Sequence, residues 1–535
     1  MHMMRRELTG WLAFALVAAG YLFFASRNIA LPGLWADEAT QACAGMKSAL
    51  KLPPEYEGWG VHVAGRWLPL NDGGEYDLSG FFLVYAALAF KLGGASVRTL
   101  RWASLLFGLG ILTAFYALVR SWFSRRLALV CAVLLAVDPV FLIWSRLTFY
   151  ICEWPDVLFG LCAALFGTLW HKKKYLSALC AATFILGFSL NASIKSLAPI
   201  LGLSIIYFVF APRSRRPSFK QAAAGAAAFV LGALNPILYN VYNRFTTVTS
   251  LWRDMNSTTM WGDRNWNILG HLRINGPMLL STISGAPASA TAGIIPPNMI
   301  AVRIYSAALI LALAICAIRR PRRLLALLAL EALMFFFTLF SPSGLTEQHL
   351  VVLWPFAVLV LVLAADWVYQ RESKAAKIAA AAGLLLLACS DVRFDAAYFR
   401  MLESTGGVER YTDAIYRLAD YLADNKILSP YALSLEMTDS ICVATQARVS
   451  PVRAHNYFFG LSPRLKAQYS AIVVEPGARY LMMSDYIRQN TGIVFGYYDA
   501  FREAARKAGR KLVIEKTIYD RAGDPVYFVY RAERP

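Results

Sequence analysis

Two adjacent carboxylates, Asp37 and Glu38, follow the first long apolar segment of the chain, within Leu-Trp-Ala-Asp-Glu-Ala-Thr at residues 34–40. They stand where a membrane surface would meet water. A carboxylate in such a place can deprotonate or orient a hydroxyl group. The alternatives are a helix N-cap for Asp37 and a solvated or structural side chain for Glu38. We predict a catalytic role for Asp37 and include Glu38 beside it.

Further ionisable residues stand at the same predicted depth in distant loops. Arg146 ends the third predicted crossing, with Tyr150 and Glu153 after it. Lys195 lies between the fifth and sixth crossings, and His349 precedes the tenth. Because ionisable groups at membrane depth are costly, they usually have a partner or a function. The cations would stabilise a lipid phosphate and the acids would act on a hydroxyl group; the alternatives are headgroup anchoring and a hydrogen-bonded histidine.

The composition indicates a polytopic membrane protein. Hydrophobic residues make up 58% of the 535 residues and charged residues only 16%. Apolar runs of about 18 residues or more recur, and each is long enough to cross a bilayer. The net charge of +19 comes from short basic clusters between these runs, which favours topology and lipid headgroups over nucleic acid. The eight cysteines show no close metal or redox spacing, and no disulfide framework is implied.

The basic clusters predict the topology. Lysine and arginine in short loops stay in the cytoplasm, so an even number of crossings should separate successive clusters. This gives about 11 transmembrane helices, with the N-terminus inside and the C-terminus outside. The first apolar segment lacks a convincing cleavage site and is interpreted as a retained anchor. The predicted crossings span residues 8–25, 100–119, 127–145, 154–170, 175–192, 196–211, 222–240, 300–318, 324–341, 350–369 and 375–390.

Two long external loops separate some of these crossings. The first, residues 26–99, contains an apolar run at 78–90 that is too short to cross. We predict that this run and a segment starting at Asp37 form two interfacial helices. The second loop, residues 241–299, mixes tryptophans with polar residues and is predicted to be a lid or binding loop, the alternative being a disordered connection.

From residue 391 the chain has spaced charges and no further spanning run. Helical periodicity at 413–426, a short strand at 480–483, a helix at 499–509 capped by Asp499 and a hairpin at 511–530 predict an extracytoplasmic α/β domain. The predicted domains are therefore 1–390 in the membrane and 391–535 outside it. Asp138, followed by proline inside the third crossing, is interpreted as a packed polar kink or a functional residue.

The outer motifs resemble those of a known family. They are Trp-x-Asp-Glu-Ala opening the first outer loop, two interfacial helices, Gly-Gly-Ala-Ser-Val-Arg-Thr-Leu-Arg at residues 93–101, and Ser-Arg ending the third crossing. Over residues 5–370 the chain resembles the GT-C glycosyltransferases, in particular the protein O-mannosyltransferase and aminoarabinose transferase branch. The resemblance implies an inverting membrane enzyme that passes a sugar from a polyprenyl-phosphate donor to a protein, lipid or glycan acceptor on the extracytoplasmic side.

The resemblance also implies residue roles. Asp37 matches the catalytic acid of the family, Arg146 and Lys195 are candidates for the donor phosphate, and the loop before the tenth crossing helps to close the site. Many members carry a second acid five residues after the arginine, where this chain has Ile151; either Glu153 substitutes or the chain follows members with a tyrosine there. A divalent cation usually binds to more than one carboxylate, so no metal ligand is assigned. The binding of a divalent cation as a cofactor is left as an alternative.

Two other functions compete with sugar transfer. A lipid-linked sugar transporter or flippase would use the same cations to bind a lipid phosphate without chemistry. A non-catalytic protein of envelope assembly would have a degenerate site. Transporters usually have paired halves and broken helices near the midplane, which the sequence does not indicate. The expected partners are the donor, its acceptor and membrane lipids, with no nucleic acid, and the expected location is a bacterial inner or plasma membrane.

Overall fold

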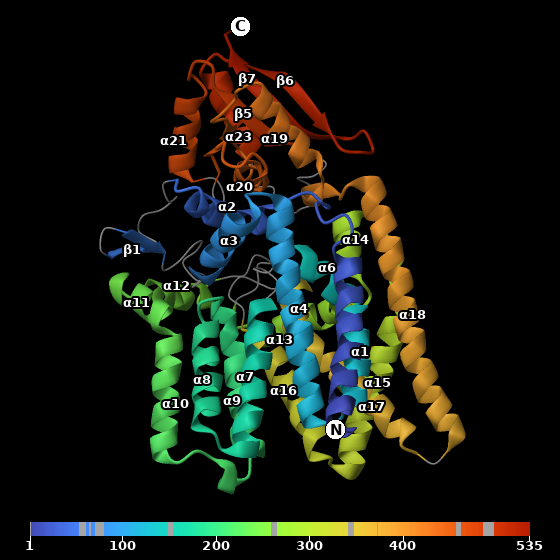
Figure 1. Cartoon of the computed structure of the whole chain (residues 1–535). Coiled ribbons are helices and arrows are strands. Elements are labelled where there is room, and N and C mark those ends of the chain that lie inside the picture. The colour runs from blue at the N-terminus through green and yellow to red at the C-terminus, as the bar shows by residue number, and fades with distance from the viewer. Residues whose placement is uncertain are drawn as a thin grey trace.

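The computed structural model describes residues 2–52, 60–63, 66–69, 80–147, 154–257, 265–340, 347–371, 373–455, 462–484 and 497–534. A bundle of apolar helices forms one layer, and a smaller α/β domain sits on the end of the bundle opposite to the N-terminus (Figure 1). Helices from the first outer loop lie between the two. The chain is an integral membrane protein.

The bundle follows the apolar segments of the sequence. Within the described residues, five helices are long and apolar enough to cross a membrane, or up to seven if each of two bent pairs is one span. Each of the eleven predicted crossings overlaps a helix or a bent pair, and the exact number of crossings stays a prediction. The bundle helices are α1 (His2–Ala25), α4 (Val97–Trp122), α5 (Arg125–Ala136), α6 (Pro139–Leu147), α7 (Trp154–Lys173), α8 (Leu176–Ser189), α9 (Leu197–Phe210), α10 (Phe219–Gly232), α11 (Leu234–Tyr242), α15 (Met299–Arg319), α16 (Arg322–Thr338), α17 (Trp354–Tyr369) and α18 (Lys374–Thr405).

Asp138 marks a sharp bend between α5 and α6, whose axes differ by 62°. Its carboxylate accepts the backbone N–H groups of Val140 at 2.9 Å and Phe141 at 3.1 Å, and so caps α6. The indole of Trp354 donates to the same oxygen at 2.6 Å. The buried carboxylate therefore supports the break in the helix, as the polar-kink interpretation predicted.

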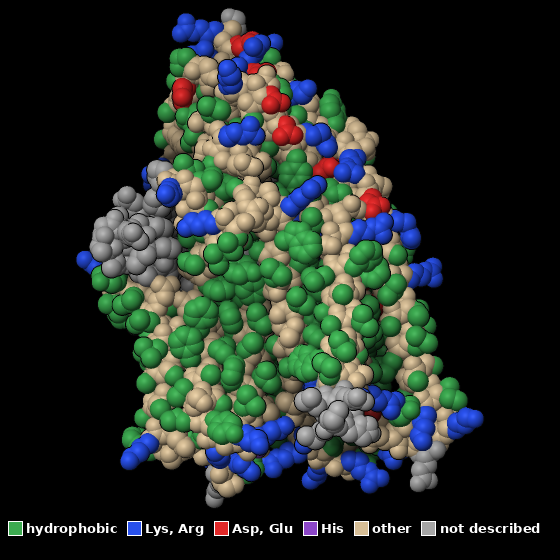
Figure 2. Space-filling view, viewed as in Figure 1, with side chains coloured by type: hydrophobic (Ala, Val, Ile, Leu, Met, Phe, Trp, Pro, Cys, Tyr) green, Lys and Arg blue, Asp and Glu red, His purple; other side chains and the backbone are tan. Residues whose placement is uncertain are grey.

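The loops that carry the basic clusters lie at one end of the bundle. Lys174 donates to the carbonyl of Arg215 at 2.8 Å, and Arg215 donates to the carbonyl of His171 at 3.1 Å. Arg323 reaches the carbonyl of Trp122 at 2.6 Å. Lysine and arginine side chains are visible along this end in Figure 2, far from the C-terminal domain. An even number of crossings between clusters predicts this arrangement.

The first outer loop forms α2 (Ala36–Ala49), a hairpin of β1 (Gly60–Val63) and β2 (Arg66–Pro69), and α3 (Gly80–Gly93). Both helices expected in this loop are present, and their place in the membrane interface stays a prediction. They pack closely, since a Cβ on Gly45 would lie 2.6 Å from the side chain of Ala86. Phe82 and Phe90 of α3 are buried in the same apolar core as α2.

The second outer loop is helical in its described part, with α12 (Thr246–Met255), α13 (Ile268–Ile283) and α14 (Ala286–Ala292). The turn into α14 is Gly285 at φ +87°, where a Cβ would collide with the ring of Phe394 in α18. Ala288 and Ala292 are completely buried. This part of the loop is therefore packed against the bundle, and its role as a lid stays a prediction.

Helix α18 continues past residue 390 and ends at Thr405, and its C-cap is Gly406 at φ +71°. The C-terminal domain has a sheet of order β4-β3-β5-β7-β6 in its described part, with β3 parallel to β4 and β5 and the last three strands antiparallel. The predicted strand and hairpin are confirmed, and Asp499 lies in the first turn of α23 rather than before it. The elements are η5 (Glu409–Tyr411), α19 (Ala414–Asp424), β3 (Tyr431–Ala432), α20 (Leu435–Ala444), β4 (Val452–Arg453), α21 (Pro463–Ile472), β5 (Arg479–Met483), α23 (Tyr497–Lys507), β6 (Lys511–Tyr519) and β7 (Pro525–Glu533).

Candidate active site

Arg101, near the start of α4, holds the segment that leads into α2. Its Nη1 donates to the carbonyls of Ile29 at 3.1 Å and Pro32 at 2.8 Å, and its Nη2 donates to that of Gly33 at 3.4 Å. The same guanidinium forms a fork on Glu38, with Nε–Oε1 at 2.8 Å and Nη2–Oε2 at 2.9 Å. Arg101 thus fixes both the approach to α2 and its first turn.

Glu38 is buried, and both of its carboxylate oxygens face Arg101. Burial raises the pKa of Glu38, and the Arg101 guanidinium acts in the opposite direction. Breaking a buried pair of this kind by removing one partner usually costs about 3–5 kcal/mol, because a charge is left uncompensated. The pairing favours a structural role for Glu38 over the predicted catalytic one. Arg101 was not predicted as this partner; an arginine close to the start of an apolar span is the sequence feature that could have indicated it.

Arg146, in the last turn of α6, holds the preceding part of the same segment. Its Nη2 donates to the carbonyls of Arg27 at 2.7 Å, Asn28 at 2.9 Å and Leu31 at 3.3 Å. The guanidinium carbon lies 4.9 Å from the ring centroid of Phe399 in α18. The side chain is completely buried, so it does not anchor in the headgroups, and Nε and Nη1 have no hydrogen-bond partner among the described residues.

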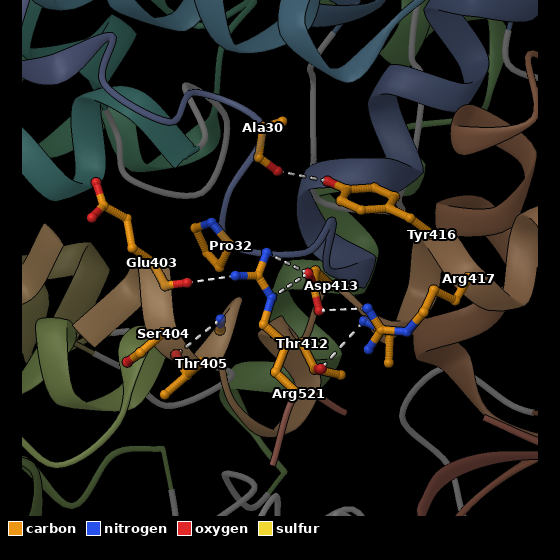
Figure 3. Close-up of polar contacts among 12 residues, drawn as sticks. Ala30, Pro32, Glu403, Ser404, Thr405, Thr412, Asp413, Tyr416, Arg417 and Arg521 are labelled. Carbon is orange, nitrogen blue, oxygen red and sulfur yellow. Dashed lines mark hydrogen bonds and ion pairs between the residues drawn. The ribbon is translucent and has the colours of Figure 1, made fainter. Parts of the chain in front are cut away.

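The C-terminal domain holds the other side of this segment. The N–H of Gly33 donates to the carbonyl of Tyr411 at 2.6 Å, and the rings of Trp35 and Tyr411 lie 5.0 Å apart. The hydroxyl of Tyr416 donates to the carbonyl of Ala30 at 3.0 Å (Figure 3). Burial raises the pKa of Tyr416 to about 12, so its hydroxyl keeps the proton that it donates.

A polar cluster joins the end of α18 to the C-terminal domain (Figure 3). Asp413 pairs with Arg521 at 2.8 Å and with Arg417 at 3.2 Å. Arg521 also donates to the backbone carbonyl of Glu403, whose carboxylate accepts the amide of Asn28 at 2.6 Å. The segment 27–35 is therefore held by contacts from α4, α6 and the start of the C-terminal domain, while the side chains of Arg27 and Asn28 are exposed.

Asp37 lies in the first turn of α2 and is half-buried. The N-cap of this helix is Trp35, so the N-cap alternative for Asp37 is wrong. The N-terminal end of a helix carries partial positive charge, which stabilises a carboxylate in the first turn. Asp37 therefore stands at the end of a segment whose carbonyl groups accept hydrogen bonds from Arg101 and Arg146.

Lys195 and His349 come together, with Nζ and Nδ1 3.1 Å apart. Lys195 lies in η2 (Ile194–Ser196) and His349 in η4 (Glu347–Leu353), the short helices that precede α9 and α17. The hydroxyl of Ser196 contacts the carboxylate of Asp156 in α7 and the carbonyl of Ser189, which ties the Lys195 turn to two helices. The sequence predicted the pair as separate members of one site and missed the supporting Asp156.

Tyr150 and Glu153 lie outside the described residues, so their predicted roles stay predictions. Within the described residues, no group of three or more His, Cys, Asp or Glu side chains could hold a metal ion. Glu153, the predicted second acid, lies in the segment 148–153, and the divalent cation that would depend on it stays a prediction.

The helical bundle and the α/β domain on its end have the fold of solved ArnT and oligosaccharyltransferase structures, and part of the chain matches a mannosyltransferase family model, in agreement with the GT-C resemblance inferred from the sequence. Residues 81–240 match the family model described as dolichyl-phosphate-mannose-protein mannosyltransferase. A comparison with curated proteins found no match.

Solved structures extend the likeness to the whole chain. The structure of ArnT from Cupriavidus metallidurans in the apo state is 12% identical, with a TM-score of 0.59 and 98% of each chain covered. The same protein bound to undecaprenyl phosphate is 13% identical, with a TM-score of 0.60 and coverage of 97% of this chain and 98% of that one. The Archaeoglobus fulgidus oligosaccharyltransferase, in complex with Zn and sulfate, is 14% identical, with a TM-score of 0.54 and coverage of 97% and 73%. At these identities the likeness concerns the fold.

Proposed function

We propose that this protein is an inverting glycosyltransferase that moves a sugar from a polyprenyl-phosphate donor to an acceptor on the extracytoplasmic side of the membrane. The observation that carries the proposal is the contact of 3.1 Å between Lys195 and His349, at the end of the bundle opposite to the basic loops. The segment before Asp37 lies at that same end. A GT-C fold and the undecaprenyl phosphate in the similar ArnT structure support this donor class.

In the proposed reaction the acceptor hydroxyl oxygen attacks the anomeric carbon of the sugar. The bond between that carbon and the phosphate oxygen breaks, and the configuration inverts. Asp37 takes or orients the proton of the hydroxyl group. The polyprenyl phosphate leaves with the electron pair, and the charge that develops on it is stabilised by a cation that is already in place.

Lys195 and His349 are proposed to receive the phosphate. Nδ1 of His349 lies next to the side-chain nitrogen of Lys195, so a donor phosphate bound here would meet a lysine and an imidazole side by side. The positive charge of the lysine would balance the charge that develops on the phosphate. Short helices backed by α7 hold both side chains, which reduces the entropy lost on binding.

Arg101, Arg146 and Glu38 are proposed to position Asp37 rather than to react. Nη2 of Arg146 donates to three carbonyls of the segment before α2, although Arg146 was first predicted to bind the phosphate. Residues 1–390 are proposed as the catalytic unit and residues 391–535 as the extracytoplasmic domain. Helix α18 runs through the boundary between them. The basic loops at the opposite end support a cytoplasmic N-terminus.

The first experiment incubates the purified protein with a panel of radiolabelled polyprenyl-phosphate sugars and a membrane extract that supplies acceptors. One donor should lose its label to the extract. Asp37→Asn should abolish transfer while the folded protein and its binding of donor persist. The matched control is Asp366→Asn in α17, at the basic end of the bundle, which should transfer normally. Transfer retained by Asp37→Asn would overturn the mechanism.

The same variants separate the competing functions. A flippase would move labelled lipid across proteoliposomes without cleaving it, and Asp37→Asn would leave that movement unchanged. An assembly protein would show neither activity in wild-type form. We expect donor cleavage in the wild type, which neither alternative produces.

A further inference from the structure

Cys43 and Cys442 lie side by side, although 399 residues separate them in the chain. Their sulfur atoms are 2.8 Å apart. Cys43 belongs to α2, the helix whose first turn carries Asp37, and Cys442 belongs to α20 in the C-terminal domain. Both are free thiols in this structure, and both are buried.

The contact is part of a built helix pair. One turn before the cysteines, the hydroxyl of Thr40 on α2 donates to the carboxylate of Asp439 on α20 at 3.0 Å. Residues three apart share one face of a helix, so α2 and α20 meet through matching pairs along both helices. Ala39 and Val443 belong to the same buried apolar core. The alignment of the two thiols is therefore fixed on both sides of the contact.

The other described cysteines have a different setting. Cys131 and Cys316 are buried inside apolar helices, Cys162 and Cys180 are partly buried in α7 and α8, and Cys389 is exposed on α18. Each lies in a segment predicted to cross the membrane. Cys43 and Cys442 instead lie in the outer loop and the outer domain, at the level where the proposed function places the extracytoplasmic side.

We propose that Cys43 and Cys442 form a disulfide bond in the native membrane, which joins the helix of the proposed catalytic acid to the C-terminal domain. The inference rests on the proposed function for the side of the membrane, since disulfides form and persist outside the cytoplasm. The oxidant is a disulfide compound of that compartment, whether a small molecule or a protein.

The reaction is a pair of thiol–disulfide exchanges. The thiolate of Cys442 attacks one sulfur of the oxidant, the disulfide of the oxidant breaks, and one thiolate leaves. The thiolate of Cys43 then attacks the sulfur of Cys442 in the mixed disulfide and releases the second thiolate. Two electrons pass to the oxidant, and the two protons lost by the cysteines end on its thiols.

The order of events follows from burial. The contact with Cys442 and burial both raise the pKa of Cys43 well above its usual range, so the packed thiol is not a nucleophile. An oxidant also has no access to a completely buried side chain. The exchange must therefore take place before α20 docks on α2, and docking then protects the bond.

The test uses the full chain in intact cells. Cells are quenched with acid, free thiols are blocked with N-ethylmaleimide in denaturant, and the protein is then reduced and labelled with iodoacetamide before peptide mapping. Cys43 and Cys442 should carry iodoacetamide, the second label, and Cys389 should carry N-ethylmaleimide, the first label. A non-reduced digest should contain the peptides of Cys43 and Cys442 linked to each other. Recovery of Cys43 and Cys442 with the first label would overturn the proposal.

A variant identifies the partner. In Cys442→Ser, Cys43 should change completely to the first label, whereas Cys389→Ser should leave the linked peptide unchanged. Cys43 that stays protected in Cys442→Ser would refute this pairing. Labelling is independent of sugar transfer, so a linked peptide in an inactive protein would count against the proposed function alone, and free thiols in an active protein would count against the disulfide alone.

Discussion

Arg101 and Glu38 form a completely enclosed, two-point ion pair between α4 and α2, with contacts of 2.8 and 2.9 Å. The same arginine also holds the carbonyls that precede α2. The direction and the start of the helix that carries Asp37 thus depend on a single guanidinium. The two adjacent carboxylates therefore have different surroundings, since Glu38 is buried against Arg101 and Asp37 is half-buried in the first turn of α2.

The first prediction concerns this pair. Glu38→Gln should destabilise the protein by about 3–5 kcal/mol, because it leaves Arg101 buried without a counter-charge. Arg101→Lys should also destabilise it, since an ammonium cannot form the fork. Thermal unfolding in detergent measures both effects. A neutral result for Glu38→Gln, with donor turnover lost in the folded protein, would instead support the catalytic role first predicted for Glu38.

The second prediction separates positioning from phosphate binding at Arg146. Arg146→Lys keeps the charge and loses the geometry that reaches three carbonyls, each hydrogen bond to a charged group contributing about 1.5–3 kcal/mol. We expect kcat to fall while KM for the donor changes little, and amide exchange to quicken in residues 26–35. A rise in KM without faster exchange would restore the phosphate-binding role.

The third prediction tests Lys195 and His349 as one unit. Lys195→Ala and His349→Ala should each raise KM for the donor, and the double variant should lose less than the sum, with a coupling of about 0.5–3 kcal/mol. Lys51→Ala, an exposed lysine just after α2, is the control and should behave as the wild type. Additive losses in the double variant would mean that the two side chains act at separate places.

The fourth prediction concerns the contact between the first outer loop and the C-terminal domain. A Cβ on Gly33 would lie 2.0 Å from the carbonyl oxygen of Thr412. Gly33→Ala should therefore cost about 1–3 kcal/mol of stability and loosen the domain from the loop. The matched control is Gly20→Ala in α1, where a Cβ meets nothing within 4 Å. Limited proteolysis after residue 405 and thermal unfolding measure the difference, and equal behaviour of both variants would contradict the packing.

The sequence by itself determined the features that depend on local chemistry. Apolar runs predicted the helices of the bundle, and basic clusters predicted the end of the bundle at which their loops meet. Asp138 followed by Pro139 predicted the bend, and the alternating residues around the turn at 521–524 predicted the C-terminal hairpin. The transfer of an apolar helix to a membrane and the pairing of neighbouring strands depend on residues that are close in the chain. Such features need no knowledge of distant partners.

Only the tertiary structure decided what the polar side chains contact. Arg101 meets Glu38 across 63 residues, Lys195 meets His349 across 154, and Cys43 meets Cys442 across 399. A buried charge or thiol predicts that a partner exists, but helix packing selects which one. For that reason Arg146 was recognised from the sequence as important, while the carbonyls that it holds could be found only in the folded chain.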